Sequence, residues 1–156
     1  MRPKLTLRAI VFGLLLMLYF GICHVEGVAD QIELRFLNIL ILGGGLWVSL
    51  YGKALKGQHF GIKYFNGLKD GLYFSFIASF VFAMSFFLYI AAGEYAIIEQ
   101  FVEKGIINES ITAMHLSVFA FMEVFVSGFM MSFIMMQYLK YDWNKKSKKK
   151  SELSYQ

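Results

Sequence analysis

One acidic residue stands inside a long apolar segment, and its chemistry is the first question that this sequence raises. The segment runs from Leu116 to Leu139, and Glu123 is its only acidic or basic residue. A charged side chain at the centre of a bilayer costs about 2.5–3.5 kcal/mol on insertion scales, so such a residue is a candidate functional site. Glu123 could take up and release a proton beside a cavity, or it could be a hydrogen-bonding group that joins helices. Ser127, one turn further along, and Asn38 in an earlier apolar segment are its candidate partners.

The other polar residues form no catalytic or metal-binding pattern. Cys23 is the only cysteine, which rules out an intrachain disulfide and a paired-cysteine metal site. His24 and His115 fall at the ends of apolar segments, where histidines are expected to anchor the chain at the interface rather than to bind a metal. The chain has no nucleophile–base pair, no glycine-rich phosphate loop and no paired carboxylates. The sequence therefore predicts a protein that is not an enzyme and has no cofactor and no metal.

Transmembrane helices are the elements that would position Glu123. Hydrophobic residues make up 58% of the 156 residues, whereas a soluble domain has roughly 45–50%. The excess is concentrated in uncharged runs close to the ~20 residues that cross a bilayer as a helix. We predict an all-α membrane protein with a four-helix transmembrane domain over 1–142, followed by a basic, disordered cytoplasmic tail over 143–156. Its four spans are expected at about 9–25, 36–55, 71–92 and 115–139.

The loop charges predict the orientation of these spans. Lysine and arginine fall in the N-terminus, the second loop and the tail, while the first and third loops are net acidic. By the positive-inside rule both termini are cytoplasmic, and the four spans form two in–out–in hairpins. The third loop, 93–110, has apolar residues at helical spacing opposite Glu99 and Glu103, which predicts a short amphipathic helix on the outer surface.

The first apolar run has two interpretations. It could be a cleaved signal peptide, because Gly27 and Ala29 offer a small-x-small cleavage site. It could also be a retained span, which its length favours, since a signal peptide has an apolar core of only ~7–15 residues. The basic N-terminus is cytoplasmic in both cases.

Small residues at i, i+4 spacing recur in every predicted span and should allow the helices to approach closely. The Gly43–Gly45 run has a further alternative, because it could be a place where a helix unwinds around a substrate. The predicted packing positions are Ala9, Gly13, Gly45, Ser49, Gly71, Ser75, Ser79, Gly128 and Ser132.

The end of the chain is rich in lysine. These side chains are expected to contact anionic lipid headgroups, each contributing ~1 kcal/mol near the surface. No folded basic module accompanies them, so nucleic acid is not a predicted partner. The lysines concerned are Lys145, Lys146, Lys148, Lys149 and Lys150.

Two stretches resemble a known family. Phe60 to Ile90 has a Phe-Gly…Gly…Gly loop before a span, and Phe121 to Lys140 has Phe-x-Glu, then Gly, then Ser, and an abrupt Lys end. Together they resemble the small four-span membrane proteins of domain of unknown function 4199, found largely in Bacteroidota. The resemblance implies an inner-membrane protein of a Gram-negative cell, a retained first span and a family glutamate that aligns with Glu123. It implies no activity.

Three functions are compatible with these features. The first is a non-enzymatic accessory or scaffolding subunit of an inner-membrane assembly, bound to other membrane proteins or to itself as a homo-oligomer. The second is a small proton-coupled transporter or permease that acts as an oligomer through Glu123. The third, lipid or quinone binding, rests only on the aromatic residues of the third span. Those residues go all round the helix, as lipid-facing side chains would.

Overall fold

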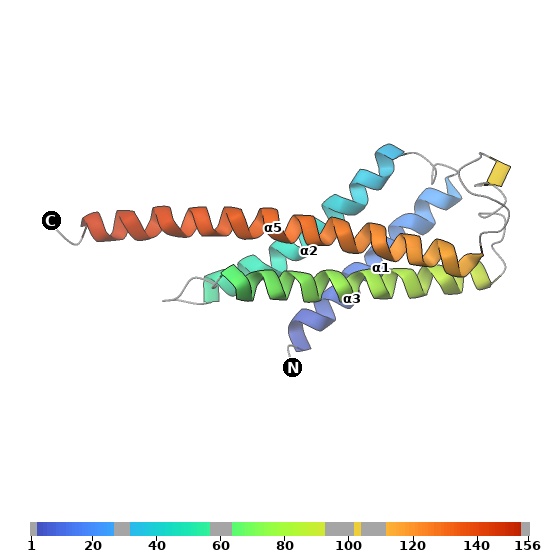
Figure 1. Ribbon diagram of the computed structural model, residues 1–156, viewed down its shortest axis with the longest axis horizontal. Helices are drawn as coiled ribbons and strands as arrows, with labels where there is room; N and C mark the ends of the chain where they lie inside the picture. The colour runs from blue at the N-terminus through green and yellow to red at the C-terminus, as the bar shows by residue number, and fades with distance from the viewer. Residues whose placement is uncertain (1–2, 27–31, 57–63, 93–101, 104–111, 154–156) are drawn as a thin grey trace.

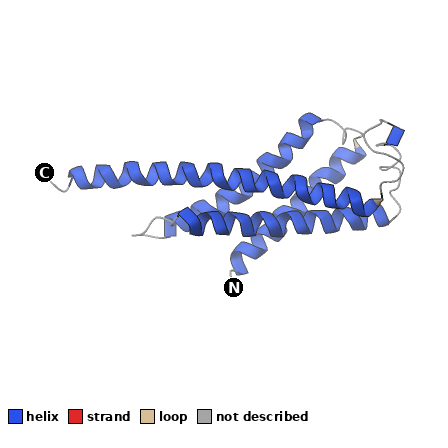
Figure 2. Cartoon of the chain, in the orientation of Figure 1, coloured by secondary structure: helices blue, strands red, loops and turns tan. Residues whose placement is uncertain are grey.

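Four long helices make up almost all of the described chain (Figure 1). They are α1 (Pro3–Val25), α2 (Ile32–Lys56), α3 (Tyr64–Ala91) and α5 (Ala113–Leu153). Figure 2 shows that the described segments are helical, with no strand among them. The computed structural model describes residues 3–26, 32–56, 64–92, 102–103 and 112–153.

The sequence explains why these helices are long. In lipid the backbone must satisfy its own hydrogen bonds, and a helix does so within one segment. Pro3 is the only proline of the chain, and it occupies the first position of α1. A proline is tolerated there because its missing N–H would have no partner within the helix.

Three of the helices are long and apolar enough to cross a bilayer. They are Pro3–Val25, Phe65–Ala91 and Ala113–Leu139, and α2 carries a shorter apolar stretch, Leu37–Tyr51. The predicted helical class and the four long helices are confirmed for the described residues, and three of the four predicted spans meet this length and composition. The hairpin topology and the cytoplasmic termini stay predictions. The composition fits a membrane-embedded, multi-pass protein. Apart from residues 102–103, which are helical, the predicted amphipathic helix over 93–110 lies outside the described residues.

Two boundaries differ from the sequence-based expectation. The segment from residue 143, predicted to be disordered, continues α5 as one helix to Leu153. Lysine, glutamate and leucine are good helix formers, and no glycine or proline follows Gly128 to end the helix. In addition, α3 begins at Tyr64 rather than at residue 71, so Asp70 lies in a helix and not in a loop.

Contacts between helices define the arrangement of the bundle. The helix α3 packs most extensively against α5 and α1, while α2 makes smaller contacts with α5, α1 and α3. Hydrogen bonds Thr6–Tyr73 and His24–Tyr89 join α1 and α3 along their lengths and show that these two helices run in the same direction. In Figure 1, α3 and α5 lie along each other, and α1 and α2 cross them obliquely.

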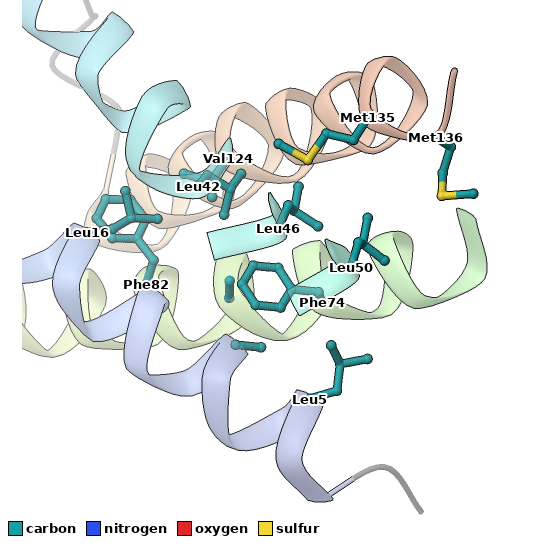
Figure 3. Packing of buried hydrophobic residues seen from close by; sticks show 12 residues of the cluster. Leu5, Leu16, Leu42, Leu46, Leu50, Phe74, Phe82, Val124, Met135 and Met136 are labelled. Carbon is teal, nitrogen blue, oxygen red and sulfur yellow. The ribbon is translucent and has the colours of Figure 1, made fainter. Parts of the chain in front are cut away.

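The core contains apolar side chains from all four helices. In Figure 3, Leu46 and Leu50 of α2 point toward Phe74 of α3, and Leu16 of α1 lies beside Phe82. Leu16, Leu46 and Phe74 are fully buried. These side chains interdigitate in the centre of the bundle.

Two reciprocal glycine–serine contacts hold α3 and α5 together. A Cβ added to Gly71 would lie 2.6 Å from Oγ of Ser132, and a Cβ added to Gly128 would meet Oγ of Ser75. Ser75 donates to the Gly71 carbonyl at 2.9 Å, and Ser132 donates to the Gly128 carbonyl at 2.7 Å. Each hydroxyl is therefore satisfied within its own helix, and the contact between the helices is close packing.

The other predicted packing positions are also buried. Ala9, Ser49 and Ser79 lie in the bundle interior. A Cβ on Gly13 would lie 2.7 Å from the Ala78 carbonyl of α3, and a Cβ on Gly45 would lie 2.7 Å from the Phe12 ring of α1. Small side chains thus stand at the α1–α2, α1–α3 and α3–α5 contacts.

The α3–α5 contact can be tested by exchanging its partners. We expect Gly71→Ala to destabilise the purified protein by ~1–3 kcal/mol, as overpacking does. The double variant Gly71→Ala/Ser132→Gly should recover most of the loss, because it removes the atoms that the new methyl group meets. The measurement is thermal unfolding in detergent, monitored as the loss of the monodisperse peak in size-exclusion chromatography after heating.

The matched control for this exchange is Gly44→Ala, since a Cβ at Gly44 meets nothing within 4 Å. It should leave the unfolding temperature unchanged or raise it. Equal destabilisation by Gly71→Ala and Gly44→Ala would contradict the packing account.

Candidate functional site

Glu123 lies on the outside of the bundle. Its side chain is exposed, whereas its neighbour Val124 is only 4% exposed and belongs to the core. We call the surrounding surface the α5 outer face. It consists of Glu123 and four exposed apolar residues, Phe119, Met122, Val126 and Met130.

The two predicted partners of Glu123 lie on different helices, Ser127 on α5 and Asn38 on α2. Ser127 donates its hydroxyl to the Glu123 backbone carbonyl at 2.7 Å, so this hydroxyl is used within its own helix. Asn38 lies half-buried on α2, and its Oδ1 has no hydrogen-bond partner among the described residues. Neither predicted partner is therefore shown to bond the Glu123 carboxyl group, which lies at the α5 outer face.

Four of the buried serines donate to carbonyl groups of their own helices, whereas Oγ of Ser49 has no hydrogen-bond partner among the described residues. Ser79 donates to the Phe76 carbonyl at 3.1 Å and Ser117 donates to the Ala113 carbonyl at 2.8 Å. Ser75 and Ser132 likewise donate to carbonyl groups of their own helices. These hydroxyls are therefore used locally, and the side chains around them are apolar.

Sequence reasoning missed one buried acidic residue. Asp70 lies in α3 and is only 6% exposed, although the loop charges placed it outside the third span. The helical spacing was a usable signal, because Gly67, Asp70 and Phe74 fall on one face, directly beside Gly71. The charge-based boundary obscured this periodicity.

The two histidines at the helix ends have structural contacts. His24 Nδ1 is 3.1 Å from the Tyr89 hydroxyl, and its ring stacks on Phe20. His115 Nδ1 is 2.7 Å from the hydroxyl of Thr112, the residue that precedes α5. The Thr112 N–H also points to His115 Nδ1, at 3.4 Å. This pair resembles a capping box, in which the third helical residue accepts from the capping residue. Within the described segments, no three His, Cys, Asp or Glu residues come together as a metal site.

An aromatic cluster lies where α2 and α5 approach the basic end of the chain. Trp47 stacks on Tyr51 with ring centroids 5.3 Å apart. The Trp47 ring also contacts the Tyr138 ring of α5, with centroids 5.6 Å apart. Tryptophan and tyrosine concentrate at headgroup depth because each has an apolar ring with a polar group. The five lysines predicted to contact headgroups follow on the C-terminal part of α5.

Comparisons of the chain with protein-family models, curated proteins and solved structures find no match. The class of protein therefore follows from the fold and the site alone. The chain forms an all-helical bundle that fits a membrane, with a packed apolar interior and a carboxyl group on its outer surface. The resemblance to domain of unknown function 4199 stays a prediction.

The placement of Glu123 can be tested with spin labels. In a Cys23→Ser background, we expect a label at Glu123→Cys to be accessible to dissolved oxygen in a bilayer, because the position faces outward. A label at Val124→Cys should be shielded, because that position is buried. Electron paramagnetic resonance with oxygen as relaxant measures the difference. The same shielding at both positions would contradict the outward placement.

Proposed function

We propose that this protein is a non-enzymatic accessory or scaffolding subunit of a membrane assembly, and that it binds its partner through the α5 outer face. One observation carries the proposal: the exposed carboxyl group of Glu123 lies among exposed apolar side chains. The apolar core supports it too, because the large side chains from all four helices at the centre of the bundle are apolar.

The energetics favour a protein neighbour at this face. A carboxyl group exposed to lipid chains is costly, by about 2.5–3.5 kcal/mol at the bilayer centre on insertion scales. A partner helix that packs here removes the carboxyl group from lipid, and a polar group on that helix adds an interhelical hydrogen bond that contributes roughly 0.6 kcal/mol on average and up to ~1.7 kcal/mol. The flanking apolar side chains would pack against the same helix. We infer that Glu123 selects a partner with a polar group at the same depth.

The proposed setting is the inner membrane, with both termini in the cytoplasm. The basic N-terminus and the lysine-rich C-terminal end support this orientation through the positive-inside rule. The Trp47–Tyr51–Tyr138 cluster would then lie at the cytoplasmic headgroups. The resemblance to the Bacteroidota family supports the inner membrane and a retained first span.

Substitution of Glu123 tests the proposed docking. We expect Glu123→Ala to reduce co-purification of the partner severalfold in mild detergent, since the polar contact is lost. Glu123→Gln should retain the partner, because an amide still forms hydrogen bonds. A C-terminal tag and quantitative mass spectrometry of the eluate provide the measurement.

The control is Leu88→Ala, which truncates another exposed side chain, on α3. It should leave co-purification unchanged. Recovery of the wild-type chain alone in several detergents would contradict the proposal. If Glu123→Gln abolished a proton flux in liposomes while Glu123→Asp preserved that flux, a proton-coupled transporter would replace the accessory subunit as the proposed function.

A further inference from the structure

A groove opens between α1 and α2 on the outside of the bundle. Its volume is about 550 Å³, within the ~300–1,000 Å³ typical of ligand sites. The α1 wall includes Phe12, Leu15 and Ile22, and the α2 wall includes Leu40 and Val48. Only Tyr19 contributes a polar atom among the lining side chains. We call this feature the α1–α2 groove.

Gly44 exposes the α2 backbone in this groove. A Cβ on Gly44 meets nothing within 4 Å, whereas a Cβ on Gly43 would lie 2.6 Å from Met131 and one on Gly45 would lie 2.7 Å from Phe12. The three consecutive glycines thus point to α5, to the groove and to α1. The helix continues through all three, so the run is not a break in α2.

A positive charge stands at one end of the groove. Arg8 lies one turn before Phe12 on α1, and its guanidinium donates to the backbone carbonyl of Val48 at 3.3 Å. Lys4 lies a further turn before Arg8 on the same helix face, and both side chains are exposed. A guanidinium has five N–H donors, so one bond to a carbonyl leaves donors for an anion.

We propose that the α1–α2 groove binds an acyl chain of an anionic phospholipid, whose phosphate contacts Arg8 and Lys4. The apolar walls match a hydrocarbon chain, and the cationic end matches a phosphate, which arginine binds through paired hydrogen bonds. The order along α1 is the order along a lipid: charge first, then a long apolar surface. This site is separate from the α5 outer face and does not rest on the proposed docking there.

Native mass spectrometry of the full chain tests this site. The protein is reconstituted in vesicles of equal phosphatidylglycerol and phosphatidylcholine, extracted gently, and examined for retained lipid. We expect the wild type to retain one phosphatidylglycerol in preference to phosphatidylcholine. Gly44→Leu should lose the retained lipid, because its side chain fills the groove. Arg8→Gln should retain lipid with no preference between the two headgroups.

Two matched controls accompany these variants. Gly21→Leu makes the same change at another open position of a helix, outside the groove lining, and should retain the lipid. Lys69→Gln removes an exposed positive charge on α3 and should keep the preference. If Gly44→Leu does not yield a monodisperse protein, Leu15→Trp fills the groove from the α1 wall.

Three results would overturn the proposal. One is equal lipid retention by Gly44→Leu and Gly21→Leu. Another is a preference for phosphatidylglycerol that survives Arg8→Gln. The third is a change of oligomeric state in Gly44→Leu without loss of lipid, which would assign the groove to a helix of a second copy. Glu123→Ala should leave lipid retention unchanged, so failure at one site is distinguishable from failure at the other.

Discussion

The close approach of α3 and α5 is the constraint on which the rest of the bundle depends. Inside lipid, burial of apolar surface does little to bring helices together, and contact between small residues does more. Gly71 faces Ser132, and Gly128 faces Ser75, so the two helices touch at two points one turn apart. Larger side chains at these points would force the helices apart, and the leucines of α2 would lose the surface on which they pack.

This packing also determines where function can lie. The serine hydroxyls at the contact are satisfied by carbonyls of their own helices, and apolar side chains fill the space around them. The exposed polar groups with a chemical role in this account are Glu123 on α5 and Arg8 on α1. Each stands at an apolar surface that faces out of the bundle. Both proposed sites therefore lie where the bundle meets its surroundings.

The sequence predicted where the helices lie along the chain better than it predicted which side of each helix faces the bundle. Apolar length and a single proline were enough for the all-α class, and i, i+4 spacing identified the small residues that lie buried. The pairing of helices could not be predicted, because Gly45 and Ser49 repeat the pattern of Gly71 and Ser75 yet Gly45 meets the Phe12 ring. The outward direction of Glu123 was equally hidden, since apolar residues surround that helix on all sides. Asp70 and the C-terminal lysine-rich segment were predicted to lie outside the helices because charged residues were taken to mark loops and tails.

A photo-crosslinking amino acid on α5 tests the central claim most directly. Placed at Met122 on the α5 outer face, it should yield one adduct of defined mass in native membranes, because a partner helix packs there. Placed at Leu88, which is similarly exposed on α3, it should yield no such adduct. Absence of an adduct at Met122, or the same adducts from both positions, would contradict the claim that this protein acts through a partner bound to α5.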